Sequence, residues 1–519
     1  MKNLLIITAL LFVFNASSQN VQLGSPFDKE TAEVVDILGT AKGKTYVTTY
    51  DGKSFYLNRF TNNVMQDLVV KMELPKAEGK KIRFLRAYLV KGQLSILGLS
   101  DDEKTKELTV VSYRLNEGNE IDPNYQLVGL VPVEKRDVFS EFKITFSSDS
   151  SQVLFYHNTP IDKGRQVRSS FILCNSKFEP IVSGNKLFTK APQDIFMGKY
   201  AVNKHGDFCL QSNLINVKGT DVVMQQYRFT SFDKTGMETG SYLVPDELTF
   251  LYEGSLTYAG KNEKDLLATA YYKDLTGFKS NSALPEDDYV HGIIQFKWSN
   301  NAASKVYSVK SKFADDVYNM CYSSKDLTKM KDKDRVYLDF SESGLMQIND
   351  YIITTKGITV IAEQVKLGGE ELKGAIWVHH FNPQGALQWT QKINKNQVHV
   401  ATIPGDGMIE YDFDIYMQLE NKQATGYFLT SSETQIELAF YGDSEATSLP
   451  LYESVKAESD MSKLSLITYS IDYTGKKKVK STKEEFGPYS PKLARRIDAN
   501  TFRVSHVEKK NNTLGILKF

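Results

Sequence analysis

A short hairpin pattern recurs along the chain and constrains its fold more than any other feature. In GAIWVHHFNPQGALQW (374–389), a β-rich apolar run meets a polar turn and resumes as a second apolar run. Six other stretches share this shape. The turns begin at positions 61, 116, 175, 233, 297, 382 and 472, so the intervals are 55, 59, 58, 64, 85 and 90 residues. The first four intervals are nearly constant, which indicates a structural repeat.

Each copy follows an upstream β-rich segment, so the repeating unit is a small antiparallel sheet. Such a sheet cannot bury both faces alone, whereas radial stacking buries them against neighbouring copies. We therefore predict an all-β chain that forms a single β-propeller over residues 19–519, with insertions around 310–345 and 400–460. Eight blades are favoured and seven are the alternative. Two β-sandwiches in tandem are the competing architecture.

The last copy, NTFRVSHVEKKNNTLGILKF, ends at Phe519, where its outer strand should begin. A blade without that strand would leave an unpaired apolar edge, which promotes aggregation. The N-terminal segment VQLGSPF is the β-capable segment that no other repeat uses. We predict that Val21–Phe27 pairs with Thr513–Phe519 and closes the ring.

The first eighteen residues have the pattern of a secretory signal peptide. Lys2 provides the positive start, an apolar run covers Leu4–Phe14, and the small residues Ala-Ser-Ser precede Gln19. We expect cleavage between Ser18 and Gln19, although a buried N-terminal strand would also fit the apolar run. The run is too short for a stable membrane anchor, and no later segment has eighteen consecutive apolar residues, so no transmembrane segment is expected.

Charge and cysteine content argue against a nucleic-acid-binding protein and against a disulfide-rich protein. Lys and Arg together number 63, as do Asp and Glu, and a nucleic-acid-binding surface would favour a basic excess. The three cysteines are too few for a disulfide framework, although one pair could form. Cys174 and Cys209 lie in apolar runs, and we expect both to be buried strand residues.

The adjacent histidines His379 and His380 invite a metal interpretation. Neighbouring residues of a strand point to opposite faces of the sheet, so these two side chains cannot bind one ion. We expect both to be packed within the propeller. No zinc, nucleophile, phosphate-loop or dinucleotide motif is present in the sequence, and we predict no catalytic residue, metal or cofactor.

Two acidic clusters are candidates for binding. Glu286, Asp287 and Asp288 lie in a polar stretch between predicted strands, and Asp412 and Asp414 share one face of a predicted strand. Neither has the glycine-punctuated loop typical of calcium sites. A glycosidase would need two carboxylates at a defined separation, which spacing in one sequence does not establish.

Two segments resemble known propeller families. FSSDSSQVLFYH (146–157) looks like the strand-turn-strand unit of TolB- and WD40-like repeats. AIWVHHFNPQGALQWTQKINKNQ (375–397) resembles exported propeller-like proteins of the Bacteroidota, although Asn382 stands where such repeats usually have Asp. The likeness is structural and covers most of the mature chain. It implies a location in the periplasm, at the outer membrane or outside the cell.

The favoured function is therefore an exported, non-enzymatic binding or scaffold module. A protein partner is expected, such as an outer-membrane export or assembly complex, and a glycan is a second class of ligand. The alternatives are a propeller-fold glycan hydrolase or lyase and a surface adhesin. Convergence of three or more acids or histidines from different blades would favour an enzyme.

Overall fold

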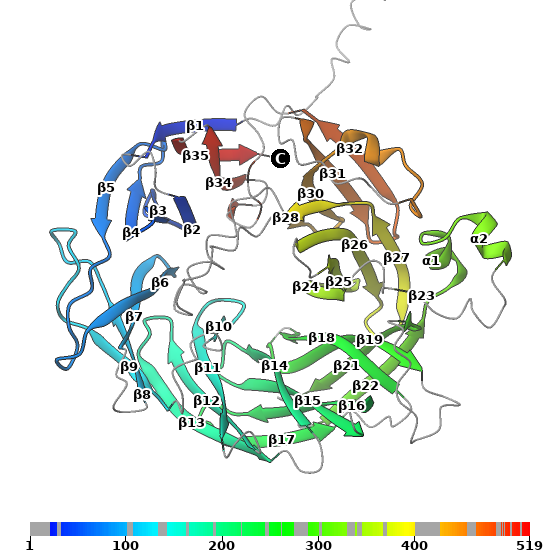
Figure 1. Cartoon of the computed structure of the whole chain (residues 1–519), viewed down its shortest axis with the longest axis horizontal. Helices are drawn as coiled ribbons and strands as arrows, with labels where there is room; N and C mark the ends of the chain where they lie inside the picture. The colour runs from blue at the N-terminus through cyan, green and yellow to red at the C-terminus, as the bar shows by residue number, and fades with distance from the viewer. Residues whose placement is uncertain are drawn as a thin grey trace, which may run out of the picture.

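A computed structural model describes residues 21–27, 33–100, 107–132, 143–161, 166–189, 194–218, 221–243, 249–260, 262–274, 289–299, 304–329, 338–339, 345–366, 371–399, 426–453, 463–483, 489, 491, 494–498, 501–508 and 511–518. Eight antiparallel sheets are arranged in a ring, which confirms the predicted eight-bladed β-propeller (Figure 1). Among these residues, no helix is long and apolar enough to cross a membrane.

The first four blades are each built from four strands that are consecutive in sequence. They are β2 (Glu33–Ala41), β3 (Lys44–Tyr50), β4 (Phe55–Phe60) and β5 (Gln66–Lys71) in blade 1; β6 (Ile82–Val90), β7 (Gln93–Ser100), β8 (Glu107–Tyr113) and β9 (Gln126–Pro132) in blade 2; β10 (Lys143–Phe146), β11 (Gln152–Ile161), β12 (Gln166–Asn175) and β13 (Pro180–Thr189) in blade 3; and β14 (Asp194–Val202), β15 (Phe208–Lys218), β16 (Asp221–Phe232) and β17 (Glu238–Leu243) in blade 4.

The remaining blades include the longer repeats. They are β18 (Thr249–Ala259), β19 (Asp265–Asp274), β21 (Gly292–Ser299) and β22 (Ser304–Lys312) in blade 5; β24 (Leu345–Thr354), β25 (Gly357–Lys366), β26 (Glu371–Phe381), β27 (Leu387–Ile393) and the short β28 (Gln397–His399) in blade 6; β29 (Phe428–Ser431), β30 (Gln435–Gly442), β31 (Ser465–Asp472) and β32 (Lys477–Thr482) in blade 7; and β33 (Arg495–Asp498), β34 (Thr501–Glu508), β35 (Asn511–Lys518) and β1 (Val21–Pro26) in blade 8.

The two ends of the described chain meet in blade 8 and close the ring, as predicted (Figure 1). Strand β1 pairs antiparallel with β35, and Val21 lies opposite Leu517. Phe27 follows the strand and is buried with Phe60 and Leu514 in a cluster that joins blades 8 and 1. The edge that would otherwise be unpaired is therefore covered.

Apolar side chains fill the seams between blades, as radial stacking requires. The largest cluster joins blades 5 and 6 and includes Tyr271 and Trp377, both fully buried. Cys174 and Cys209 are buried strand residues, as expected, and all three cysteines are free thiols. Burial raises the pKa of the Cys209 thiol to about 12, so this thiol stays protonated and unreactive.

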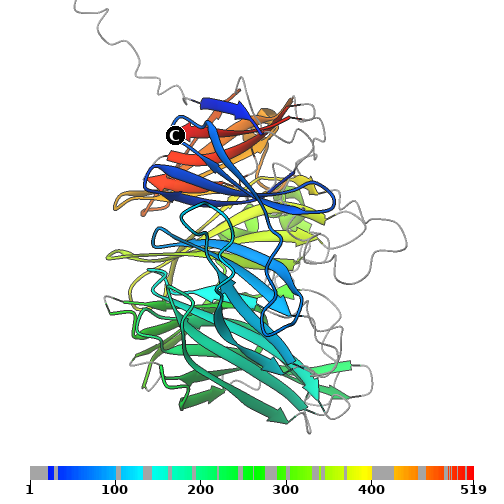
Figure 2. The same cartoon turned by 90° about the vertical axis from the view of Figure 1, so that its left-hand side faces the viewer.

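The two faces of the ring differ in their connections. In a four-stranded antiparallel blade, the first and third turns lie on one face, here named the turn face, and the remaining connections lie on the other. That opposite side carries α1 (Asp315–Asn319), α2 (Ser324–Lys329), the short helix η6 (Ser444–Thr447) and a two-stranded pairing of β20 (Tyr289–Val290) with β23 (Leu338–Asp339). Figure 2 views the ring from its edge, so that the two faces lie on either side of the stacked sheets.

Candidate functional site

The turn face is built from a repeated five-residue turn. At Asn382, the backbone N–H bonds the carbonyl four residues on, and the N–H of Gly385 bonds back to the Asn382 carbonyl. The same pair of bonds forms turns that begin at Thr61, Asn116, Asn175, Asn203, Asp233 and Asp472. The predicted turn positions are therefore confirmed except at 297. Lys297 lies inside β21, where its ammonium pairs with Asp265 at 2.9 Å, so its polarity marks a surface strand position.

An Asp or Asn at the first turn position has a structural reason. The Asp233 Oδ1 atom accepts bonds from the backbone N–H groups of Thr235 and Met237, and Asp472 does the same for Thr474 and Lys476. The Thr235 hydroxyl also donates to Asp233 and lowers the pKa of that carboxyl. These carboxylates are used within their own turns, as Asx turns require.

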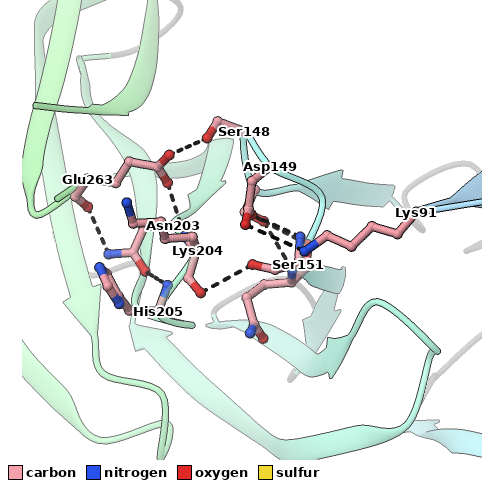
Figure 3. A network of polar contacts seen from close by, with 10 residues as sticks. Lys91, Ser148, Asp149, Ser151, Asn203, Lys204, His205 and Glu263 are labelled. Carbon is pink, nitrogen blue, oxygen red and sulfur yellow. Dashed lines mark hydrogen bonds and ion pairs between the residues drawn. The ribbon is translucent and has the colours of Figure 1, made fainter. Parts of the chain in front are cut away.

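The inner turns of blades 2 to 5 are linked to one another across the turn face (Figure 3). Lys91 of blade 2 pairs with Asp149 of blade 3 at 3.6 Å, and Ser151 of blade 3 donates to the Lys204 carbonyl of blade 4 at 3.2 Å. Burial opposes ionisation of Asp149, but bonds from the hydroxyl groups and backbone around it lower its pKa to about 2. This carboxylate is therefore ionised at neutral pH.

Glu263 of blade 5 is the common partner in this network. Its carboxylate accepts from the Lys204 backbone N–H at 3.1 Å and from the Ser148 hydroxyl, and its carbonyl accepts from the Asn203 amide at 3.0 Å. His205 adds a bond to the neighbouring Asn262 carbonyl. Glu263 thus joins turns of blades 3, 4 and 5, and this network, which we call the turn network, fixes part of the turn face (Figure 3).

Charged side chains of three blades converge on the inner strands near the ring closure. Asp36 of blade 1 accepts from Arg86 of blade 2 at 3.0 Å and from Arg495 of blade 8 at 3.4 Å. Arg495 also donates from Nε to the Ile37 carbonyl at 2.7 Å. The Asp36 side chain is nearly buried, whereas both arginine side chains are about half exposed. This convergence joins two cations to one acid and does not bring two carboxylates together.

A second polar cluster lies between blades 6 and 7, with some members partly and others fully buried. Asp350 accepts from the Tyr427 hydroxyl at 2.5 Å, and burial raises the pKa of its carboxyl. Glu363, 3% exposed, forms an ion pair with the fully buried Lys395 ammonium. The sequence analysis did not predict this cluster. Glu363 interrupts the apolar strand ITVIAEQV, and this interruption could have indicated a buried polar contact. Gln397 accepts from the Gly426 N–H at 2.8 Å, so residues on either side of 400–425 meet here.

The two adjacent histidines point into opposite seams, as their strand position predicted. His379 bonds the Tyr271 hydroxyl of blade 5 at 2.8 Å and the Thr390 hydroxyl at 3.0 Å. His380 bonds the Thr359 hydroxyl at 2.9 Å and stacks on Trp389. Burial lowers the pKa of His379 to about 3. Both histidines are therefore packing residues.

The acidic residues singled out from the sequence, Glu286, Asp287, Asp288, Asp412 and Asp414, lie outside the described residues, as do Ser18 and Gln19. Within the ranges that the structure describes, no three His, Cys, Asp or Glu side chains form a group that could hold a metal ion.

No protein-family model matches this chain, and no curated protein matches it. Among solved structures, the WD40 domain of SCAP from fission yeast matches 96% of this chain and 98% of its own, at 8% identity and a TM-score of 0.38. The β-propeller domain of the Trilobed protease from Pyrococcus furiosus matches 90% and 99%, at 9% identity and a TM-score of 0.33.

A chain from a structural and mechanistic analysis of two prolyl endopeptidases matches 94% of this chain at 9% identity and a TM-score of 0.37, but this chain spans only 54% of it. At such TM-scores these likenesses carry no argument about function. The strand order within each blade and the pairing of β1 with β35 assign this chain to the eight-bladed β-propeller fold.

Proposed function

We propose that this chain is an exported, non-enzymatic binding or scaffold module that receives a protein partner on its turn face. The observation that carries the proposal is the turn network, in which inner turns of four consecutive blades are linked by an ion pair between blades 2 and 3 and by hydrogen bonds among blades 3, 4 and 5 (Figure 3). Turns held in this way lose little freedom on binding, so more of the contact energy is available for affinity. Binding residues are commonly presented on turns of a rigid scaffold.

The signal-peptide pattern and the family resemblance support a location in the periplasm or at the outer membrane. An accessory subunit docked on an outer-membrane export or assembly complex is the specific form of this proposal. The first test of this proposal is intact-mass measurement of the native protein. The measured mass should correspond to a chain that begins at Gln19. A native protein that retains Lys2 would contradict export through this signal.

Asp350 and Glu363 favour glycan hydrolysis as a second candidate, because glycosidases use two nearby carboxylates. Glu363 is buried and neutralised by Lys395, however, so it is not available to a substrate in this arrangement. Binding is therefore the better supported function. Release of sugars from envelope glycans by the wild type, abolished in Asp350→Asn, would instead establish the enzyme.

The main experiment compares two double variants in the native envelope. K42E/K234E reverses charge at exposed turns of blades 1 and 4, and K312E/K483E makes the same change on exposed residues at the ends of the outer strands β22 and β32 that lie away from the turn face. A cross-linked partner, identified by mass spectrometry and confirmed with purified components, should bind the wild type and the outer-strand variant and lose affinity for the turn-face variant. Equal binding by all three would contradict the use of this face.

A further inference from the structure

The seam between blades 8 and 1 contains two arginines on one face of the same sheet. Arg495 of β33 lies directly opposite Arg503 of β34 in the antiparallel pairing, so both side chains project from the same face. The neighbours Phe502 and Val504 pack towards blade 7, which places Arg503 on the face towards blade 1. Its Nη2 atom lies 3.5 Å from the carbonyl of Asn62 in a blade 1 turn. Like charges in such a position repel one another.

Within the described ranges, Arg503 is buried without a carboxylate partner. It is 4% exposed, and its Nε and Nη1 atoms are buried with no hydrogen-bond partner among the described residues. The Ser505 hydroxyl, two residues along the same face, is also buried and lacks a partner there. Burial lowers the pKa of Arg503. Burying a guanidinium without a counter-charge strongly destabilises a fold. A bound anion would therefore stabilise Arg503.

Asp36, which pairs with Arg495, does not neutralise Arg503. Asp36 is shared between Arg495 and Arg86, and Arg86 Nε is also without a partner within the described part of the chain. Among the described residues, one carboxylate, Asp36, pairs with two of the three arginines at this seam, which leaves a local excess of two positive charges. The whole chain has a formal net charge of zero, so this excess is a local feature.

We propose that the seam between blades 8 and 1 binds a small oxyanion, phosphate or sulfate, through Arg503, Ser505 and Arg495. The guanidinium fork donates two parallel bonds to an oxyanion, and a serine hydroxyl supplies a third. The near-complete burial of Arg503 admits a small ion rather than a polymer. Arg495, about half exposed, offers the approach from the solvent-accessible inner strands. This site is independent of the partner proposed for the turn face.

The test is calorimetric titration of the mature protein with inorganic phosphate and, separately, sulfate, with ionic strength held constant by sodium chloride. The wild type should bind one ion per chain. Arg503→Met should weaken binding by about tenfold or more, and Arg503→Lys should give an intermediate loss because it keeps the charge but not the fork. Sodium acetate, titrated in parallel, should bind more weakly than both ions, because it fills fewer of the donors.

Two further variants keep the test decisive. Arg496→Met alters the exposed next residue of β33, which projects from the other face, and should leave binding unchanged. Asp36→Asn removes the competing carboxylate and should tighten binding. Circular dichroism checks that each variant is folded. If Arg503→Met does not fold, the loss of affinity is measured with Arg503→Lys instead. No binding by the wild type, equal binding by Arg503→Met, or weaker binding by Asp36→Asn would each overturn the proposal.

Discussion

Many polar residues buried in the seams of this propeller are bonded by a neighbouring strand or blade, and Arg503 is an exception. His379 illustrates the rule, since its two ring nitrogens bond hydroxyl groups of Tyr271 and Thr390. Strand alternation alone predicted that His379 and His380 point to opposite faces. It did not predict Tyr271 as a partner, because that residue is 108 positions away and the contact depends on how two blades pack.

His379 should make stability depend on pH. Its pKa is about 3 in the folded protein and near its ordinary value of about 6.5 when unfolded, so the unfolded chain takes up a proton first as pH falls. The stabilisation is full above pH 6.5 and is lost as pH falls towards 3. Relative to His379→Gln, the wild type should lose about 2 kcal/mol between pH 7 and 5. Urea unfolding at both pH values measures this, and a constant difference would be inconsistent with a neutral buried histidine.

Breaking the buried Glu363–Lys395 pair should destabilise the fold strongly, whereas replacing both residues should destabilise it little. Glu363→Gln leaves the Lys395 ammonium buried without its carboxylate partner, and we expect a loss of about 3–5 kcal/mol in the free energy of unfolding. The double variant E363Q/K395M removes the buried charge as well and should recover most of the loss. Denaturant titration of the single and double variants distinguishes the two outcomes, and equal losses would argue against a coupled pair.

At the scale of elements, the repeated turn explains why the sequence revealed the fold so directly. Asx residues at 233, 382 and 472 are followed three positions later by glycines with φ between +78° and +86°, so turn chemistry is readable from the sequence. The pattern is less visible in blades 1 and 3, where Val64 and Phe178 occupy the same left-handed position. Lys297 misled the prediction because a polar surface residue inside a strand looks like the start of a turn.

A pair of glycine variants separates backbone strain from packing between blades. Gly52 and Gly385 have φ of +88° and +86°, so alanine is strained by about 1 kcal/mol at either position. An added Cβ at Gly385 would collide with the Tyr307 ring of blade 5, whereas none of the described atoms lies within 4 Å of one at Gly52. Gly385→Ala should therefore lower the melting temperature clearly more than Gly52→Ala. Equal shifts would indicate that Tyr307 moves aside.

At the scale of the whole molecule, the ring closure was predicted from the interrupted last repeat, since only one β-capable segment remained to complete it. The acidic clusters could not be assessed in the same way, because a shared strand face does not say which blades bring carboxylates together. Two carboxylates that the fold does bring close together, the partly buried Asp350 and the buried Glu363, come from neighbouring strands of blade 6. Their environment depends on Tyr427 and Lys395, which sequence spacing does not bring together.

Removing the closing strand should destabilise the whole ring. A chain that begins at residue 28 loses β1 and the buried Phe27 and leaves β35 with an open edge, so it should self-associate. We expect its melting temperature to fall on the order of 10 °C. A synthetic peptide of residues 19–28 should restore both the monomer and the melting temperature, as measured by light scattering and calorimetry. A truncated chain that stays monomeric and equally stable would show that β1 is dispensable.

The direction of the closing strand also has a mechanical consequence. Val21 lies opposite Leu517, so the two ends of the described chain emerge at the same end of the β1–β35 ladder. A force that pulls these ends apart would load the ladder bonds one after another, as in unzipping, rather than all together, as in shear. The closure that protects the ring against heat would then yield at a low tension, and a ring under tension through its ends would open at blade 8 while the other seven blades remain folded.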